Sequence, residues 1–380
     1  MISLLGICIC VCVYLLTMLY LGASITAGLL IMHCVIVPLI FRYSKTFRRT
    51  IVFVNFVQWP YNVNFEEPAS SGILGARNLS IEYHSKVDDC KMRIGIWHIL
   101  PKSAYEKLME MFDGTTDKEA LNKIMDEELA TSGKPIMLYC HGNANSRGAT
   151  HRLELYKFFQ NMDYHTISFD YRGYGDSTNV TPSEDGVVED ALVVYEWLHG
   201  QLAGRAPPGA APPVFVWGHS LGTAISAHLL GNLEELCARR LGRESPLPPP
   251  RGLILEAPFN NLVDEVAHYP LQILATWLPY HDYAFLEPFR RCPEHEFRSD
   301  EHLARAPRLP LLLLHARDDL VVPYAVGHKL YKYLVKARSE SGGEPIKFHS
   351  FDKKLDLGHK WICHADNLPE IVDDFIKCNR

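Results

Sequence analysis

Residues 218–222, with the sequence GHSLG, constrain the fold more than any other segment because of what flanks them. The apolar run Pro213 to Trp217 is typical of a buried strand, and Thr223 to Leu233 is typical of a helix. Between a strand and a helix, the pattern G-x-S-x-G is a nucleophile elbow, a tight turn that exposes its serine. Glycines leave room for that turn, and the helix N-terminus favours an oxyanion beside it. The segment therefore predicts that Ser220 is a nucleophile.

A nucleophilic serine of this kind needs an acid and then a histidine, each in a loop after a strand. Leu309 to Leu314 is a short apolar run typical of a buried strand, and Asp318 and Asp319 follow it. We expect Asp319 to be the acid, because it lies four residues before Pro323, where such a loop usually carries it. Asp318 is then expected to be a solvated or loop-capping carboxylate.

The histidine is chosen from the 18 in the chain by its position. The strand-like run Ile346 to Phe351 contains His349, and a closing helix is expected from about Asn367 to Cys378. His359 alone follows a glycine in the loop between them, so we expect it to be the base. His364, expected at the start of the closing helix, is the second candidate.

An oxyanion hole needs a second backbone donor, normally from the loop after the third strand of such a sheet. Pro135 to Cys140 is expected to be that strand, and residues 141–145 (HGNAN) follow it. The predicted donors are the backbone N–H groups of Asn143 and Leu221. The alternative is that His141 and Gly142 only form a turn at the end of the strand.

These segments resemble the α/β-hydrolase domain-containing protein 12 subfamily, as do residues 94–98 (IGIWH), 151–157 (HRLELYK) and 255–261 (LEAPFNN). The resemblance runs from about Val37 to the C-terminus. It implies an α/β-hydrolase fold, which is a mostly parallel sheet with helices on both faces and a cap insertion, preceded by an N-terminal membrane segment. Carried over by motif, it also implies a catalytic triad of Ser220, Asp319 and His359.

The resemblance further implies a membrane-anchored lipase that acts on lysophosphatidylserine and monoacylglycerols. Such a serine hydrolase uses an acyl-enzyme and requires no metal or organic cofactor. Arg147, Arg152 and Arg172 are candidate cations for a phosphoserine headgroup, and the favoured alternative is that each is a surface or structural arginine. The alternatives are an acyl-protein thioesterase with the same chemistry, a serine peptidase, and a non-catalytic α/β-hydrolase scaffold.

The N-terminal 41 residues contain no charged side chain. As a helix they would measure about 60 Å, against roughly 30 Å of bilayer hydrocarbon. They therefore form either one span with an apolar extension or two spans that break near Gly22. We expect a membrane anchor over residues 1–45 and one hydrolase domain over residues 46–380.

About fifty residues separate the strand Gly252 to Glu256 from the next strand, which is long for a crossover. We expect a cap at about residues 259–306, whose apolar side chains suit an acyl chain drawn from the bilayer. The alternative is a core-packing excursion without substrate contact. Nearer the anchor, Ile51 to Tyr61 is apolar and aromatic, and is expected to lie either at the bilayer surface or as a packing arm of the domain.

Two features of the sequence give opposite orientations. Arg42 and the three basic residues that follow it would hold that end of the anchor in the cytoplasm. Asn78 and Asn179 begin glycosylation sequons, which matter only in the secretory lumen. The resemblance implies the endoplasmic reticulum membrane with a lumenal catalytic domain, and we follow it.

Composition excludes several other classes. The net charge of −6 and the lack of a basic stripe argue against nucleic-acid binding, so the expected partners are the lipid substrate and the bilayer. The sequence has no P-loop, no Rossmann fingerprint and no metal-ligand spacing of His and Cys. The cysteines show no disulfide-framework spacing, which leaves one or two bridges open.

Overall fold

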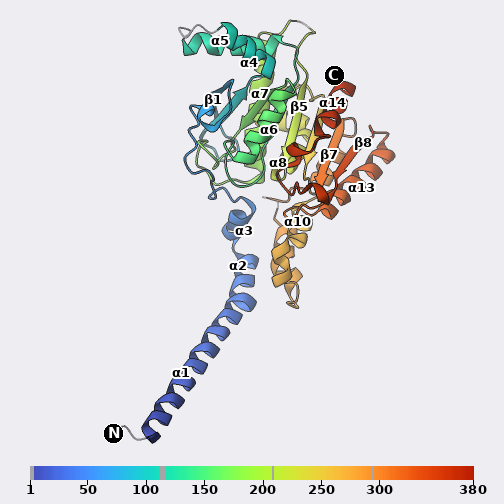
Figure 1. The fold of residues 1–380 in the computed structure, drawn as a ribbon. Coiled ribbons are helices and arrows are strands. Elements are labelled where there is room, and N and C mark those ends of the chain that lie inside the picture. The colour runs from blue at the N-terminus through green and yellow to red at the C-terminus, as the bar shows by residue number, and fades with distance from the viewer. Residues whose placement is uncertain (1–3, 112–116, 208, 293–294) are drawn as a thin grey trace. The chain divides into compact units, whose positions relative to one another are not determined.

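The computed structural model describes residues 4–111, 117–207, 209–292 and 295–380 (Figure 1). Residues 1–3 of the predicted anchor and residues 293–294 of the predicted cap lie outside the described residues. The chain forms two compact units. The first comprises the residues up to Arg48 together with Leu271–Arg291, and the second comprises Arg49–Pro270 and Cys292–Arg380.

The second unit is built on a sheet that has eight strands within the described part of the chain. They are β1 (Ala76–His84), β2 (Lys91–Ile99), β3 (Ile136–Cys140), β4 (His165–Phe169), β5 (Val214–His219), β6 (Gly252–Glu256), β7 (Leu311–Ala316) and β8 (Ile346–Phe351). Their order in space is β1-β2-β4-β3-β5-β6-β7-β8. β2 is antiparallel to both of its neighbours, and every later pair is parallel.

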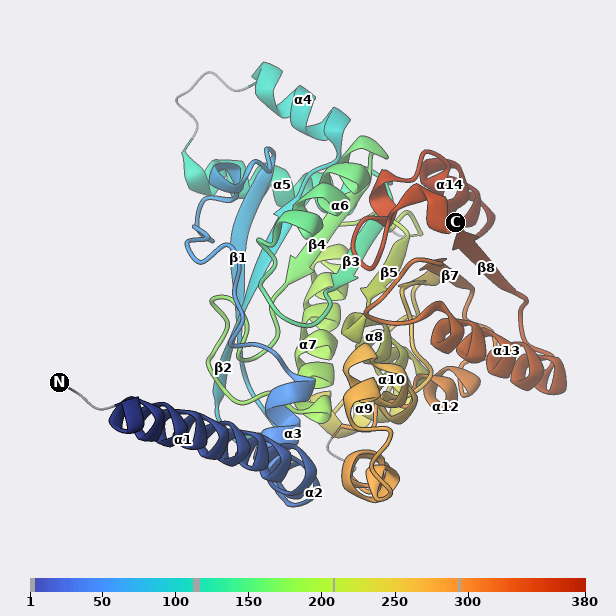
Figure 2. The same ribbon diagram turned by 60° about the horizontal axis from the view of Figure 1, so that its bottom comes forward.

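Helices lie on both faces of this sheet (Figure 2). The helices of the second unit are α3 (Lys45–Val52, which begins in the first unit), α4 (Lys102–Met111), α5 (Lys118–Thr131), α6 (Thr150–Asn161), α7 (Glu184–Ala203), α8 (Leu221–Gly231), α9 (Leu233–Leu236), α10 (Leu262–His268), α12 (Ser299–Ala304), α13 (Tyr324–Ser341) and α14 (Leu368–Cys378). Side chains of α6 and α14 share one core with residues of β3, β5 and β7, including Trp217 and Phe375. β3 to β7 are buried along their whole length, because helices cover both of their faces.

The first unit contains one long N-terminal helix and a short helical segment. The helix runs as α1 (Leu4–Ile31), a π-helical stretch (Met32–Ile36) and α2 (Val37–Tyr43) without interruption at Gly22. Its residues Cys12–Tyr43 are long and apolar enough to cross a membrane. The described residues thus form one candidate span rather than two. The segment from Leu271 to Arg291 contains short helices at Pro270–Leu274, Asp282–Leu286 and α11 (Glu287–Arg290).

The predicted fold class is confirmed. β6 and β8 have the bounds that the sequence predicted. Both ends of each of the other predicted strands lie within two residues of their predicted positions. The strand-to-helix transition at residues 219–221 is also confirmed, since β5 ends at His219 and α8 begins at Leu221.

Candidate active site

Ser220 occupies the turn between β5 and α8 in a strained conformation. Its φ of 52° and ψ of −119° lie in a region that residues with a side chain rarely adopt. The turn fits only because its flanking residues are glycines: a Cβ on Gly222 would overlap the carbonyl oxygen of Cys140, and one on Gly218 would overlap that of Gly222. The backbone N–H of Ser220 donates to the carbonyl oxygen of Glu256 at 2.9 Å. The serine is therefore fixed at the carboxyl end of the sheet.

Asp319 and His359 come together from the loops after β7 and β8. His359 Nδ1 lies 2.8 Å from Asp319 Oδ2, and both side chains are almost completely buried. The other carboxylate oxygen of Asp319 accepts the backbone N–H groups of Val321 and Val322 at 2.8 and 2.9 Å. Because the acceptor is a carboxylate, Nδ1 carries the proton and Nε2 is left free as a base.

The histidine loop is tied to the serine turn by the residue that precedes the serine. His219 Nε2 donates to the carbonyl oxygen of His359 at 2.8 Å, and the two rings lie 4.9 Å apart. The hydroxyl of Ser220 makes no hydrogen bond to another described residue. In an apo structure such catalytic contacts are often open, and they tighten when substrate binds.

The neighbouring candidates have other roles. Asp318 Oδ2 accepts the backbone N–H of Gly358 at 2.8 Å, so this carboxylate caps the histidine loop, which was one of its two predicted roles. His349 lies in β8, as predicted. His364 lies in a separate 3₁₀ turn (Ile362–His364) before α14 rather than at its start, and it stacks on Trp361 with ring centroids 5.2 Å apart.

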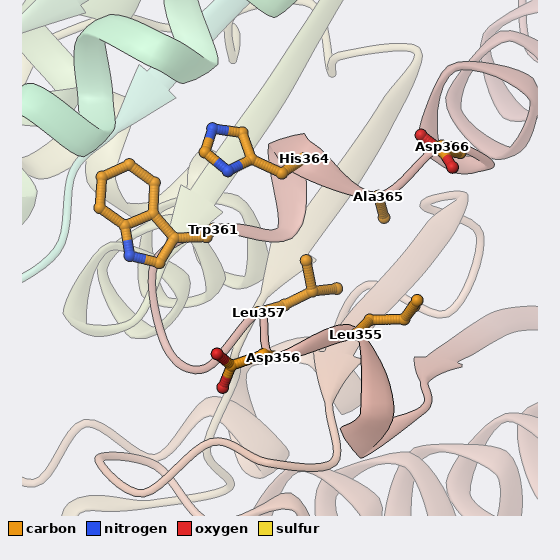
Figure 3. Close-up of a pocket in the computed structure, with 7 residues that line it drawn as sticks. All are labelled: Leu355, Asp356, Leu357, Trp361, His364, Ala365 and Asp366. Atoms are coloured by element: carbon orange, nitrogen blue, oxygen red, sulfur yellow. The ribbon is translucent and has the colours of Figure 1, made fainter.

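His364 also lines a cavity of about 270 Å³ (Figure 3). The remaining lining residues are Leu355, Asp356, Leu357, Trp361, Ala365 and Asp366. Neither Ser220 nor Asp319 lines this cavity, so the second candidate base lies in surroundings unlike those of His359.

The loop after β3 approaches the nucleophile closely. A Cβ on Gly142 would lie 3.1 Å from the Cβ of Ser220, which only glycine permits without rearrangement. Arg152 braces this loop from behind by donating to the carbonyl oxygens of Gly142 and Ala144 at 2.7 and 2.8 Å. The backbone N–H groups of Asn143 and Leu221 donate to no other described residue. Both therefore remain available as the predicted oxyanion donors.

The side chain of Asn143 is held by the segment that follows α3. Asn143 Nδ2 donates to the carbonyl oxygen of Val52 at 2.6 Å, and Asn143 Oδ1 accepts the N–H of Val54 at 2.9 Å. The next contact is made by Asn145, whose Oδ1 accepts the N–H of Trp59 at 2.7 Å. Residues 52–59 thus form a packing arm, one of the two alternatives for this segment, although Trp59 itself remains 64% exposed.

The proposed headgroup role of three arginines is wrong. Arg147, Arg152 and Arg172 are fully buried. Arg147 pairs with Asp170 at 2.6 Å, and Arg172 pairs with Glu189 and Asp190, each at 2.9 Å. A fully buried guanidinium cannot contact a substrate headgroup, and carboxylates already neutralise Arg147 and Arg172, so these arginines are structural.

Two buried acids near Asp319 were missed by the sequence analysis. Burial, helped by the charge of Asp319, raises the pKa of Glu256 to about 8. The hydrogen bond that Trp217 Nε1 donates to this carboxyl at 2.8 Å opposes the shift. Burial and the charge of Asp319 likewise raise the pKa of Glu265, on α10, to about 8. Both acids are mostly protonated at neutral pH and add little negative charge near Asp319. From the sequence, Glu256 was named only as the end of a predicted strand and as part of a segment that carries the resemblance, and no role was assigned to its carboxyl group.

The imidazoles around the serine are kept neutral. Burial lowers the pKa of His219 far below its usual value, and the neighbouring His359 lowers it further. Burial and then the charge of Arg152 lower the pKa of His151 in the same direction. His219 therefore acts as a neutral N–H donor through Nε2 rather than as a cation.

One cluster has the composition of a metal site. Glu184, His228 and His302 place their ligand atoms within 4.8 Å of one another. However, Arg305 donates to Asn232 Oδ1, which turns the amide so that its Nδ2 donates to His302 Nδ1 at 2.8 Å. The proton of a neutral His302 must then sit on Nε2, the atom that faces Glu184, and it leaves no lone pair for a metal. The cluster is better explained as a buried hydrogen-bonded network.

The two sequons differ in accessibility. Asn78 lies in β1, where Nδ2 donates to Glu66 at 2.9 Å and Oδ1 accepts from Arg147 at 2.9 Å. Asn179 is exposed in the loop between β4 and α7. Only Asn179 presents a side chain that is open to modification. All cysteines whose surroundings the structure describes are free thiols.

Comparisons with known proteins identify relatives of this chain. The family model for the α/β-hydrolase fold matches residues 135–264. The lysophosphatidylserine lipase ABHD12 of Danio rerio is 33% identical over 341 residues, which are 90% of this chain and 80% of that protein. Protein ABHD12B of Homo sapiens is 30% identical over 86% of this chain and 79% of its own length. An α/β-hydrolase structure from Vibrio vulnificus superposes with a TM-score of 0.54 at 16% identity, covering 88% of this chain and 92% of that one, which supports the fold alone.

Proposed function

Because this chain belongs to the ABHD12 family of α/β-hydrolases, we propose that it is a serine hydrolase that cleaves acyl esters of lysophospholipids, lysophosphatidylserine among them, and of monoacylglycerols. The observation that carries the proposal is the Asp319–His359 pair beside the strained turn of Ser220. The relatives named lysophosphatidylserine lipase support the substrate class. The monoacylglycerol activity rests on the resemblance noted from the sequence.

In the proposed mechanism, His359 Nε2 takes the proton of Ser220 Oγ as that oxygen attacks the ester carbonyl carbon. Asp319 holds the imidazole in the required tautomer and stabilises the imidazolium. The oxyanion is bound by the N–H groups of Leu221 and Asn143, each of which contributes about 3–4 kcal/mol by analogy with other oxyanion holes. The imidazolium then protonates the departing glycerol-side oxygen. Water, deprotonated by the same histidine, releases the fatty acid.

A cation for an anionic headgroup is offered by Lys360 rather than by the buried arginines. Lys360 is exposed, follows the proposed base directly, and is close enough to influence His219 and His151 electrostatically. An exposed ammonium at this position suits a phosphate or carboxylate on the substrate.

The proposed location is the endoplasmic reticulum membrane with the catalytic domain in the lumen. Residues 1–45 would serve as the anchor and residues 46–380 as the hydrolase domain, with the cap at about residues 259–306. The apolar helix supports membrane anchoring, and the exposed sequon at Asn179 supports a lumenal orientation. Loss of a glycan from Asn179→Gln, but not from Asn78→Gln, would agree with this orientation. Absence of a glycan from both asparagines, when the protein is expressed in a secretory cell, would contradict this orientation.

Labelling with a fluorophosphonate probe tests the enzymatic proposal. We expect the full-length protein to be labelled and Ser220→Ala to be unlabelled, while Ser339→Ala, on the surface of α13, is labelled as wild type. Hydrolysis of lysophosphatidylserine and of monoacylglycerol should disappear in Ser220→Ala and persist in Ser339→Ala. A folded wild-type protein that takes up no probe would favour a scaffold. Probe labelling with hydrolysis of an acyl-protein thioester, but with no turnover of either lipid, would favour an acyl-protein thioesterase.

A further inference from the structure

Residues 269–281 form a segment without Asp, Glu, Lys or Arg, and all but its first two residues belong to the same compact unit as the N-terminal helix. Side chains of this segment and of the residues just after it are buried against the last third of the helix. The cluster contains Ala275, Leu278, Ala284 and Phe285, with Cys34, Val37, Phe41 and Tyr280 packed against it. The segment therefore packs against the C-terminal part of the candidate membrane span.

The contacts follow the helix away from its charged end. Near that end, Arg42 pairs with Glu287 at 2.9 Å and lies 4.0 Å from the ring centre of Tyr283. Two turns deeper, His33 Nε2 donates to the carbonyl oxygen of Leu274 at 2.8 Å, and its ring stacks on Trp277. Nine residues of helix separate Arg42 from His33, which is about 14 Å, or nearly half of the bilayer hydrocarbon.

The outer face of the segment is apolar and uncovered. Ile273, Leu274 and Trp277 are 75%, 57% and 60% exposed. The apolar helix residues Val35 and Leu39 are exposed as well. An apolar surface of this kind on a protein in water marks a site of interaction, and here it belongs to a segment packed on a helix whose composition suits lipid.

Several polar groups of the segment are paired within the unit, which lowers the cost of placing them in hydrocarbon. The indole Nε1 of Trp277 donates to the carbonyl oxygen of Leu274 at 2.7 Å. His281 Nε2 donates to Gln272 Oε1 at 2.7 Å, and the backbone N–H groups of Ala275 and Leu278 donate within the segment. The indole N–H of Trp277 therefore does not depend on water for its hydrogen bond.

We propose that residues 269–281 are embedded in the bilayer, entering from the side on which the helix ends at Tyr43. Ile273, Leu274 and Trp277 contact the acyl chains, and the Arg42–Glu287 pair lies at the headgroup level, where charged and aromatic side chains collect. The membrane contact of this protein is thus made by two segments far apart in the sequence. Apart from the first two residues of the segment, this inference concerns the first unit, and it does not depend on the proposed activity.

Photo-crosslinking tests the proposal without any measurement of hydrolysis. The full-length protein is reconstituted into phosphatidylcholine vesicles that contain a phosphatidylcholine with a diazirine in its acyl chain. We expect lipid adducts on Ile273, Leu274 or Trp277 as well as on α1. Tyr333 and Val335, exposed on α13, serve as the matched control and should carry none. Adducts on α1 without any on the segment, or crosslinks from the segment to a second copy of the chain, would overturn the proposal.

A substitution gives an independent measurement. Ile273→Asp should lower the equilibrium constant for placing the segment in the acyl region by roughly 50-fold or more, because a carboxylate is costly within hydrocarbon. The lipid adducts on the segment should therefore disappear while those on α1 persist. Tyr333→Asp should leave both sets of adducts unchanged. Persistence of the segment's adducts in Ile273→Asp would contradict embedding.

Discussion

Replacing Glu256 with glutamine is expected to remove a loss of stability that the wild-type protein undergoes as the pH rises from 5 to 8. Burial raises the pKa of this carboxyl from 4.5 to about 8, and the nearby charge of Asp319 adds to the effect. Glutamine has the same shape, carries no charge at any pH, and keeps an oxygen to accept the indole N–H of Trp217.

The sign follows from proton binding. Between pH 4.5 and about 8, the folded protein holds a proton that the unfolded chain has released, so the free energy of unfolding falls as the pH rises. Each pH unit in this window costs about 1.4 kcal/mol. The loss at pH 7 is therefore about 3 kcal/mol, and it levels off above the folded pKa. The glutamine variant lacks this loss.

The measurement is thermal unfolding of the full-length protein in detergent micelles at pH 5, 6, 7 and 8. The melting temperature of Glu256→Gln should exceed that of the wild type by an amount that grows from pH 5 to pH 8. Glu265 titrates in both proteins and cancels in the difference. Glu234→Gln, exposed on α9, is the control and should give a difference independent of pH. A difference for Glu256→Gln that is equal at pH 5 and pH 8 would refute the reasoning.

Three substitutions test the catalytic side chains in ester hydrolysis. Asp319→Asn should lower kcat by about 10³- to 10⁴-fold, because an amide favours the wrong tautomer of His359; a loss below tenfold would contradict its role. His219→Phe removes the N–H that holds the His359 carbonyl oxygen and should lower kcat by about tenfold, with partial recovery in His219→Gln; equal loss in both variants would argue for packing alone. Lys360→Met should raise KM for lysophosphatidylserine by about 2- to 5-fold, the range for an exposed ion pair, and leave that for monoacylglycerol unchanged; equal effects on both would remove the headgroup role.

The sequence predicted those features that depend on local pattern. The apolar runs that became β3 and β5 to β7 are buried on both faces, so they contain few polar residues and are recognisable without knowledge of their partners. The position of Ser220 follows from two glycines and the strand and helix on either side. The pairing of Asp319 with His359 was predicted because each follows a strand, and parallel strands bring their carboxyl ends to one edge of the sheet.

The errors and omissions concern charge, because the sequence shows which groups can ionise but not what surrounds them. Arg147 and Arg172 were read as possible ligands for an anion, yet carboxylates from distant segments already neutralise them. Glu256 was read as an ordinary member of a motif, yet burial keeps it largely protonated beside Asp319. Each outcome depends on segments tens of residues away that remove water from the group. An ionisable residue near a predicted nucleophile therefore needs its three-dimensional environment before a charge or a role is assigned, and the exposed Lys360 is a better candidate for an anionic headgroup than any of the buried arginines.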